Sequence, residues 1–160
     1  MKAVVCTRYG PPEVLQVAEV ETPTPKDHEI RVKVRATTVT AADFRVRSFT
    51  IPLAFWIPAR LILGVTKPKK PILGVELAGE VDAVGKNVKL FVKGDHVFAS
   101  TLTNMGAYAE YTCIPENGAI ALKPENISFE EAAAIPIGAC TALRFLRKGE
   151  IEPGKKILIY

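Results

Sequence analysis

The stretch from Gly74 to Val97 constrains the fold more than any other part of the chain. After Gly74, apolar residues alternate with polar or small ones, as in a strand with one face in a core. A second alternation, at Val88, Leu90 and Val92, follows and ends at a Gly94–Asp95 corner. The pattern predicts two strands joined by turns, with glycines where the backbone bends or approaches a neighbour closely: Gly74, Gly79, Gly85 and Gly94.

The segments before this stretch also have the period of strands. Residues 2–6 and 14–20 are predicted to be two short strands on either side of a turn at residues 9–12. Residues 29–36 alternate between charged and apolar side chains, which indicates a half-buried strand. Its inward-facing residues are expected to be Ile30, Val32, Val34 and Ala36, with Arg31, Lys33 and Arg35 facing water.

A helical period replaces the strand period near the end of the chain. Residues 115–126 are rich in turn formers, and Ser128 with Glu131 forms a capping box that predicts a short helix through Ala134. Pro136 and Gly138 are expected to end this helix. A second helix is predicted over residues 139–148, with Gly149 as its stop.

Composition indicates a folded domain with a hydrophobic core. The chain has 160 residues, of which 48% are hydrophobic and 24% charged, so disorder is not expected. Residues 1–8 lack the pattern of a signal peptide. The scattered Cys6, Cys113 and Cys140 have no CxxC spacing, which favours reduced thiols. We therefore expect a cytoplasmic protein.

The net charge of +4 is concentrated between Phe44 and Val75, where there is no acidic residue. The bases in this segment could face nucleic acid, the phosphate of a cofactor, or only solvent. Solvent exposure is favoured over nucleic acid because no platform of stacking aromatics accompanies the bases, so no nucleic-acid partner is expected. These bases are Arg45, Arg47, Arg60, Lys67, Lys69 and Lys70.

Residues 49–63 are dense in aromatic and aliphatic side chains without forming a membrane span. Pro52, Pro58 and Arg60 interrupt the run, which is shorter than the roughly 20 apolar residues that cross a bilayer. No membrane partner is therefore expected. Phe49, Phe55 and Trp56 in this run either line the mouth of a substrate pocket or cap the core as a satellite cluster.

Four ordered motifs together resemble the medium-chain dehydrogenase/reductase superfamily: the turn 40–47, the stretch 74–97, the strand 106–111 with its G-x-Y-A-E-Y pattern, and the junction 136–142. The resemblance implies a mainly β fold, a GroES-like partly open β-barrel with a few short helices. Residues 1–126 would be the GroES-like catalytic domain. Residues 127–160 would hold transition helices and the first strand of a Rossmann nucleotide-binding domain, at 157–160.

The resemblance is to the zinc-independent, quinone oxidoreductase-like branch. Val75 stands where zinc alcohol dehydrogenases have a metal-binding histidine, and Thr40 stands at the position of their catalytic cysteine. Neither side chain is a good zinc ligand. The connection 98–106 also has no cysteine and no room for a structural-zinc lobe. No metal site is therefore expected.

For the site, the resemblance implies catalytic roles for Thr40 and Asp43 and cofactor contacts for Thr40, Arg45 and Thr141, with Phe49 and Trp56 around the substrate. Hydride would pass from NADP(H), favoured over NAD(H), to a quinone, enone or carbonyl compound, with the Thr40 hydroxyl donating to the developing oxyanion. Arg47 matches a structural position. Thr40 and Asp43 could instead be only capping residues, and Thr141 only a first-turn threonine.

A non-enzymatic GroES-like binding or assembly module is the alternative class. Co-chaperonins need a long glycine-rich mobile loop, which is absent from this sequence, whereas the Thr141-Ala142 pair is typical of dehydrogenases. The 160 residues contain no G-x-G-x-x-G turn, so this chain alone is expected to be inactive. An exposed apolar strand at 157–160 would favour a homodimer.

Overall fold

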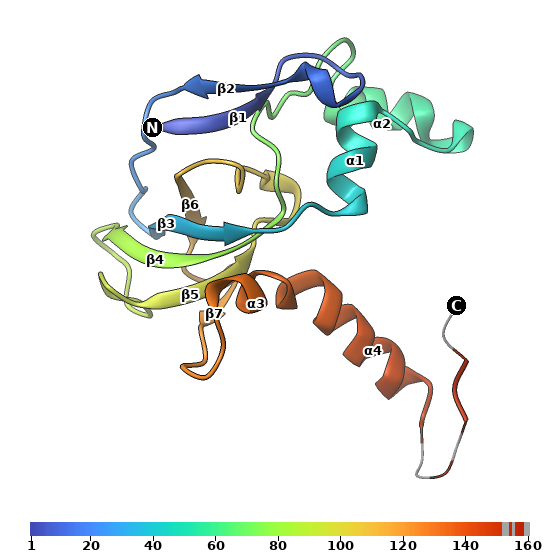
Figure 1. Cartoon of the computed structure of the whole chain (residues 1–160). Helices are drawn as coiled ribbons and strands as arrows, with labels where there is room; N and C mark the ends of the chain where they lie inside the picture. Colours follow the sequence, from blue (N-terminus) through green and yellow to red (C-terminus); the bar gives the residue numbers. More distant parts are fainter. Residues whose placement is uncertain (152–153, 155, 159–160) are drawn as a thin grey trace.

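The computed structural model describes residues 1–151, 154 and 156–158. A five-stranded antiparallel sheet, in the order β6-β3-β4-β5-β7, forms the body of the molecule, and β1 and β2 form a separate two-stranded sheet beside it (Figure 1). The strands are β1 (Lys2–Cys6), β2 (Leu15–Glu19), β3 (Glu29–Thr37), β4 (Glu76–Val84), β5 (His96–Ser100), β6 (Tyr111–Pro115) and β7 (Ala119–Leu122).

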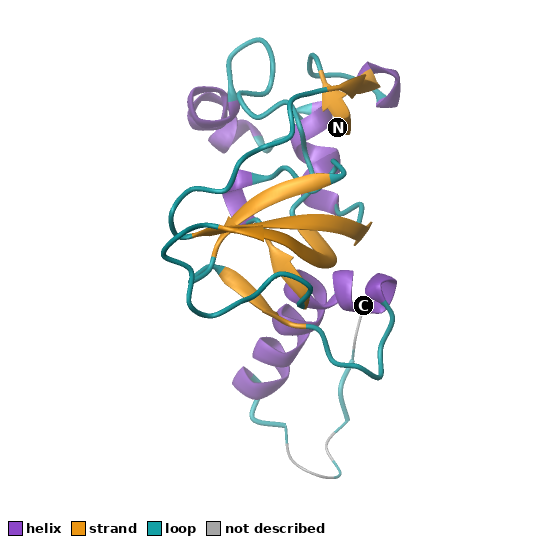
Figure 2. Ribbon diagram, turned by 90° about the vertical axis from the view of Figure 1, so that its left-hand side faces the viewer, coloured by secondary structure: helices purple, strands orange, loops and turns teal. Residues whose placement is uncertain are grey.

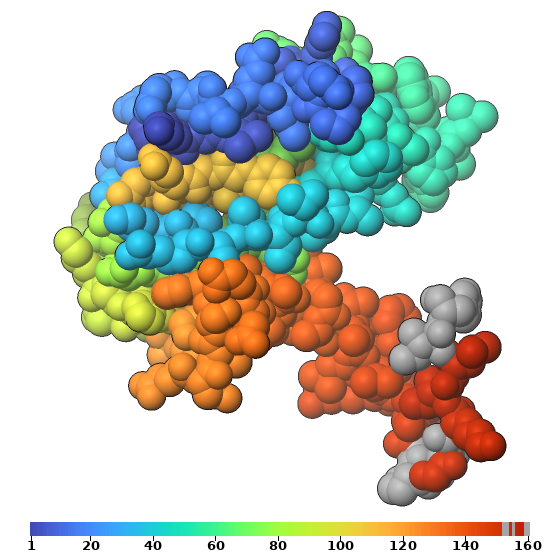
Figure 3. Space-filling model, in the orientation of Figure 1, coloured from blue at the N-terminus to red at the C-terminus, as the bar shows by residue number. Residues whose placement is uncertain are grey.

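The helices lie outside this body. α1 (Ala41–Ser48) and α2 (Trp56–Leu63) are near the small sheet, while α3 (Phe129–Ala133) lies against the large sheet and α4 (Cys140–Lys148) projects away from it (Figures 1 and 3). The shorter turns are the 3-10 helices η1 (Pro12–Val14), η2 (Leu53–Phe55) and η3 (Leu102–Asn104) and the π-helical turn η4 (Ile135–Ala139).

The strand β3 is half-buried within the large sheet, as its alternating sequence predicts. It pairs with β4 on one side and with β6 on the other, and Ile30 and Val32 are completely buried. Register shifts in the β3–β4 pairing accompany the strong curvature of the sheet, which curls into a half-barrel (Figure 2). Leu77 and Val97 complete the core with other buried residues of the same sheet. The expectation of a partly open β-barrel is confirmed.

Two of the predicted glycine positions allow neighbouring backbones to come close. A Cβ atom at Gly79 would collide with the carbonyl oxygen of Lys33 on the paired strand β3, and one at Gly85 would collide with that of Lys26. Glycine is therefore required at both positions for steric reasons, because no side chain fits between the two backbones.

The prediction of a second strand over Val88, Leu90 and Val92 is wrong. The backbone N–H groups of Lys89 and Leu90 donate to Glu116 Oε2 at 2.7 and 2.9 Å, and Val92 N–H donates to Asp95 Oδ2 at 2.8 Å. Carboxylates thus take the donors that a strand ladder would use. The strand that pairs with β4 is β5 instead.

Three other boundaries differ from the sequence-based expectation. The turn-rich segment 115–126 contains β7, which pairs with β5, and the strand expected over 106–111 begins only at Tyr111, as β6. As predicted, the α-helix α3 ends before Pro136, at Ala133, and the π-helical turn η4, which contains Pro136 and Gly138, leads into α4. Of the predicted strand 157–160, residues 157 and 158 are not in a strand, and residues 159 and 160 lie outside the described residues.

The run at residues 49–63, for which the sequence predicted no secondary structure, forms η2 and α2. Pro58 is accommodated because it lies in the first turn, where its missing N–H is not needed. Among the described residues no single helix is long and apolar enough to cross a membrane. Taken as a pair bent by 69°, the helical segments Ala41–Ser48 and Leu53–Leu63 satisfy that test of length and composition.

Candidate functional site

The turn between β3 and α1 holds Thr40 in a reciprocal cap. The Thr40 backbone N–H donates to Asp43 Oδ2 at 2.9 Å, and the Asp43 N–H donates to Thr40 Oγ1 at 3.4 Å. The Thr40 hydroxyl also donates to Asp43 Oδ2 at 2.6 Å. Thr40 is therefore the N-cap of α1, and in this conformation its single hydroxyl proton is committed to Asp43.

Asp43 extends this cap into the core. Its side chain is buried, and Oδ1 accepts a hydrogen bond from the Gly74 N–H at 3.0 Å. The buried carboxylate thus ties the start of α1 to the segment that leads into β4. Burial, and then the charge of Asp43, raise the pKa of Tyr108, whose hydroxyl donates to the Thr38 carbonyl oxygen at 3.1 Å.

Glu76 links the same turn to the η4–α4 junction. This carboxylate is only 3% exposed, and its Oε2 accepts from the Thr38 hydroxyl at 2.6 Å. Its Oε1 accepts from the backbone N–H of Ile137 at 2.5 Å. Thr38 is two residues before Thr40, and Ile137 is four before Thr141. The two turns predicted to face the cofactor are therefore joined through one buried carboxylate.

Glu76 and Thr38 are functional candidates that sequence reasoning did not assign. The sequence did mark Glu76 as an acid inside an apolar strand next to Val75, although it gave that acid no role. Its partner Ile137 lies 61 residues further along the chain and contributes only a backbone group. The residue type at position 137 therefore gives no sign of the contact.

Arg45 and Thr141 are exposed, on α1 and α4 respectively. Neither side chain makes a hydrogen bond or ion pair with any described residue. A free guanidinium and a free hydroxyl suit the phosphates, ribose or carboxamide of a nicotinamide cofactor. The chemistry of these groups therefore fits the predicted cofactor contacts.

Arg47 is placed differently from Arg45, although both are on α1. Its side chain is buried, and a guanidinium nitrogen donates to the Gly10 carbonyl oxygen at 2.5 Å. The Gly10 N–H donates back to the Arg47 carbonyl oxygen at 2.9 Å. Arg47 therefore fastens α1 to the turn between β1 and η1, which is a structural role.

Phe49 and Trp56 form an aromatic cluster with Tyr9 around Arg60. Phe49 is 8% exposed and ends α1 in the left-handed region, with a φ of 54°. The Arg60 guanidinium carbon lies 3.7 Å from the centre of the Phe49 ring and 4.8 Å from that of Trp56. Trp56 remains 42% exposed. Phe49 therefore supports the cluster from inside, and Trp56 is the member of the predicted pair that a ligand could touch.

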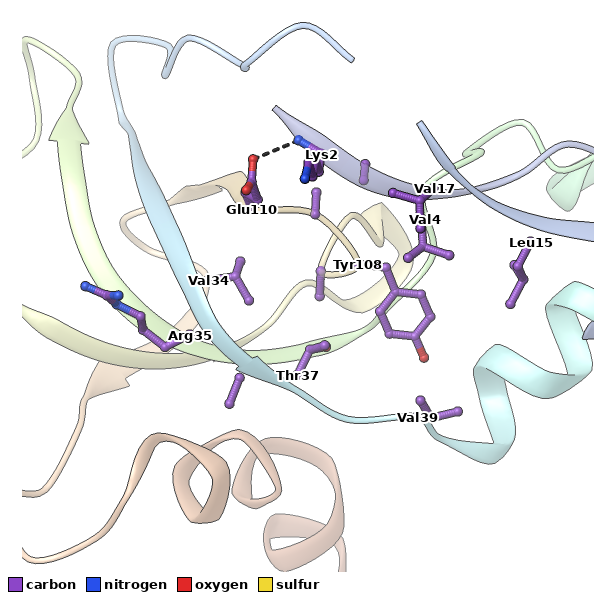
Figure 4. Close-up of a pocket in the computed structure, with 14 residues that line it drawn as sticks. Lys2, Val4, Leu15, Val17, Val34, Arg35, Thr37, Val39, Tyr108 and Glu110 are labelled. Atoms are coloured by element: carbon purple, nitrogen blue, oxygen red, sulfur yellow. Dashed lines mark hydrogen bonds between the residues drawn. The ribbon is translucent and has the colours of Figure 1, made fainter. Parts of the chain in front are cut away.

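An apolar pocket of about 500 Å³ lies between the β1–β2 sheet and the end of β3 (Figure 4). Val4, Val34 and Val39 line it, the ring of Tyr108 stands in its wall, and Lys2 N–H donates to Glu110 Oε2 at its rim at 2.7 Å. Thr37, like Val39, lines the pocket, which therefore extends to the turn that contains Thr40. None of the predicted site residues lines it.

The side-chain atoms of the site that could bind a metal are oxygens of threonine, aspartate and glutamate. The apolar Val75 lies beside them. Within the described part of the chain, no group of three or more histidine, cysteine, aspartate or glutamate side chains is placed to hold a metal ion. Cys6 and Cys113 are withdrawn from solvent, and burial raises the pKa of both thiols, that of Cys113 to about 11. The arrangement can bind and orient a cofactor and donate hydrogen bonds.

Comparison with known proteins places these features in a family. The model of the alcohol dehydrogenase GroES-like domain matches residues 26–124. Human quinone oxidoreductase is 34% identical over 166 residues, which cover 100% of this chain and 45% of that protein. The chain thus spans about half the length of the curated relatives it matches.

Solved structures show the same similarity. The quinone oxidoreductase from Coxiella burnetii superposes with a TM-score of 0.82 at 29% identity, over 96% of this chain and 46% of that one. The Escherichia coli quinone oxidoreductase complexed with NADPH gives a TM-score of 0.79 at 31% identity, over 97% of this chain and 43% of that one.

Proposed function

Because this chain belongs to the alcohol dehydrogenase GroES-like domain family, in the quinone oxidoreductase-like branch of the medium-chain dehydrogenases/reductases, we propose that it forms the catalytic domain of a zinc-independent NAD(P)H-dependent oxidoreductase. The proposed substrates are quinones, enones or related carbonyl compounds. A nicotinamide cofactor, when bound, supplies the hydride.

The Glu76 bridge is the observation that carries this proposal. The Glu76 carboxylate accepts hydrogen bonds from Thr38 and from Ile137. It therefore connects the turn that contains Thr40 to the segment that leads to Thr141. A hydride acceptor has to be held between groups whose relative positions are fixed, because small displacements slow such reactions strongly. A buried charge-assisted bridge provides that rigidity.

Thr40 is proposed to stabilise negative charge on the substrate oxygen. Its hydroxyl must turn away from Asp43 to donate to the substrate. Asp43 remains held by the Gly74 and Thr40 N–H groups after that turn, so the backbone of the site does not have to move. In this scheme, Asp43 accepts the hydrogen bond of the Thr40 hydroxyl between turnovers, when no substrate oxygen is present to accept it.

Arg45 and Thr141 are proposed to contact the cofactor. Trp56 is proposed to contact the substrate, with Phe49 supporting Trp56 from behind. The positive, acid-free segment 44–75 favours NADP(H) over NAD(H), because an extra phosphate needs extra positive charge. The bound NADPH of the E. coli relative supports the same choice. Val75 and Thr40 support zinc independence through their poor metal-ligand chemistry.

The proposed setting is a cytoplasmic protein that acts on small molecules and can form a homodimer. An assembly module without activity is the second candidate, and no observed feature of the described residues favours it. A sevenfold ring in size-exclusion chromatography would support it instead.

The proposal is tested on the product of the natural gene, including any sequence that follows Tyr160. NADPH oxidation is followed with a panel of quinones and enones in the wild type and in Thr40→Val, with Thr40→Ser as the conservative rescue and the exposed Thr24→Val as the control. Turnover should fall at least about tenfold in Thr40→Val only, since one hydrogen bond to the oxyanion is lost. Stoichiometric bound zinc with activity on alcohols alone would contradict the proposal. The 160-residue chain by itself should neither turn over substrate nor bind NADPH tightly.

A further inference from the structure

The outer face of η2 and α2 is an apolar surface that the proposed oxidoreductase function leaves unexplained. Single exposed apolar residues are common on proteins, but a contiguous group on one short element marks an interaction surface. Leu53 is 89% exposed and Ile62 is 71% exposed. The group, called here the α2 patch, consists of Leu53, Phe55, Ile57, Leu61, Ile62 and Val65, which are all largely exposed.

The inner face of α2 fixes the direction of this patch. Trp56 and Arg60, one turn apart, are both packed against Phe49, and Arg60 also lies 4.9 Å from the centre of the Tyr9 ring. Ile62, two positions after Arg60, lies on nearly the opposite side of the helix, and Ile57 and Leu61 lie about 100° around the axis from the anchors. The anchored helix therefore presents its apolar residues outward, and α2 protrudes at the edge of the molecule (Figures 1 and 3).

Positive charge borders the patch. Lys67, Lys69 and Lys70 are exposed and follow the helix directly, and Lys69 Nζ donates to the Leu61 carbonyl oxygen at 2.6 Å. No acid occurs between Phe44 and Val75, and the flanking Asp43 and Glu76 are buried. An apolar face with a basic border is typical of helices that lie in the interface of an anionic membrane.

A small hollow adjoins the same border. It has a volume of about 160 Å³ and lies between the end of α2 and the lysines, with Ile62, Leu63, Lys69 and Lys70 among its lining residues. Apolar walls beside two lysine side chains match the boundary between an acyl chain and an anionic headgroup.

We propose that the α2 patch docks this protein onto an anionic lipid surface. The helix lies in the plane of the interface, with its apolar residues among the acyl chains and the lysines against lipid phosphates. The sequence-based expectation of no membrane partner rested on Pro52, Pro58 and Arg60, which interrupt a span. Those residues do not prevent a helix from lying on the surface, because such a helix does not cross the bilayer.

Two other occupants compete with a lipid surface. A second copy contacting the same patch would bring no acid to the lysines, since the segment has none. Sequence that follows α4 is also a candidate occupant, because Figures 1 and 3 show α2 and α4 projecting toward the same side of the molecule. Both occupants remain distinguishable in the test.

Trp56 is the only tryptophan of the chain and lies on α2, so it is a native fluorescent reporter. Vesicles of phosphatidylcholine alone and of phosphatidylcholine with one quarter phosphatidylglycerol are titrated into the product of the natural gene, including any sequence that follows Tyr160, and binding is measured by tryptophan emission and by co-sedimentation. Binding to the anionic vesicles with a blue shift, at least tenfold tighter than to the neutral ones and weakened by salt, is the expected result.

Matched variants distinguish vesicle binding through the α2 patch from non-specific binding through other exposed residues. The double variant Ile57→Asp/Leu61→Asp should abolish binding, whereas Val17→Asp/Leu90→Asp, which changes two equally exposed apolar residues elsewhere, should leave it unchanged. Lys67→Gln/Lys70→Gln should weaken binding about thirtyfold, since each lysine near an anionic surface contributes about 1 kcal/mol. The control Lys33→Gln/Lys93→Gln removes the same charge from other exposed positions and should bind more tightly than the patch variant.

Three results would overturn the proposal. The first is no binding of the wild type to anionic vesicles. The second is binding that the patch variants and their controls weaken equally. The third is a dimer in light scattering that Ile57→Asp/Leu61→Asp dissociates while vesicle binding is absent, which would assign the patch to a second copy of the chain.

Discussion

The five-stranded sheet and the helices α2 and α4 are both rich in apolar residues, yet only the sheet buries them. Leu77 and Val81 on β4 are completely enclosed by neighbouring strands. In contrast, α2 and α4 have no buried residue at all, and Leu143 and Phe145 of α4 are exposed. Apolar composition therefore does not decide burial: β4 has partners within the chain on both sides, whereas the outer faces of the two helices have none among the described residues.

The largest difference is expected between two side-chain truncations, one in the sheet and one on α2. Leu77→Ala in the sheet should lower the free energy of unfolding by about 2–5 kcal/mol, because it removes buried contacts and leaves a cavity. Ile62→Ala on α2 removes a similar side chain and should change it by less than about 0.5 kcal/mol. Urea denaturation followed by circular dichroism measures both. Equal losses would show that α2 is packed as tightly as the sheet.

The cap at Thr40 tests the point where the sheet passes into the first helix. Thr40→Ala should lower the free energy of unfolding by about 1 kcal/mol, because the N-cap of α1 and the bond to Asp43 are both lost. Thr40→Ser keeps the hydroxyl and should lose less, and the exposed Thr24→Ala serves as the matched control. A Thr40→Ala variant as stable as its control would contradict a capping role.

Tyr108, which lies between the two sheets, gives the smallest effect, and it is confined to alkaline pH. Because its pKa is raised in the folded state, the folded protein keeps the phenol proton that the unfolded chain loses above about pH 10. Stability should therefore fall as the pH rises from about 10 toward the folded pKa. Urea denaturation of the wild type and of Tyr108→Phe over this pH range measures the fall, which should be shallower in the variant. Parallel curves would contradict the assignment.

The sequence predicted those parts of the fold that depend on local pattern. The alternation of residues 29–36 identified β3, and Ser128 with Glu131 identified the start of α3, because both signals act within a few residues. The alternation of Val88, Leu90 and Val92 was misleading because Glu116, which accepts from the N–H groups of Lys89 and Leu90, lies more than 20 residues away. The short strand β7 depends on its pairing with β5 and has no comparable local signal.

For the site, the resemblance to a family gave the residue types and the structure gave their connections. Val75, Thr40 and Asp43 could be found by aligning motifs, and the predicted roles of Thr40, Asp43, Arg45, Phe49, Trp56 and Thr141 stay predictions. The Glu76 bridge could not be found in this way, because one partner is a backbone N–H. The placement of Phe49 under Arg60 also depends on α2, a helix that the sequence did not predict.

The bridge between Glu76 and Ile137 is the central claim, and amide hydrogen exchange at Ile137 tests it most directly. Exchange is measured by NMR in the wild type, in Glu76→Gln, and in Glu80→Gln as a control on the same strand. The account predicts a protected Ile137 amide that exchanges about tenfold faster in Glu76→Gln, since the charge-assisted bond is weakened, and no change in Glu80→Gln. An Ile137 amide that exchanges at the same rate in all three proteins would contradict it.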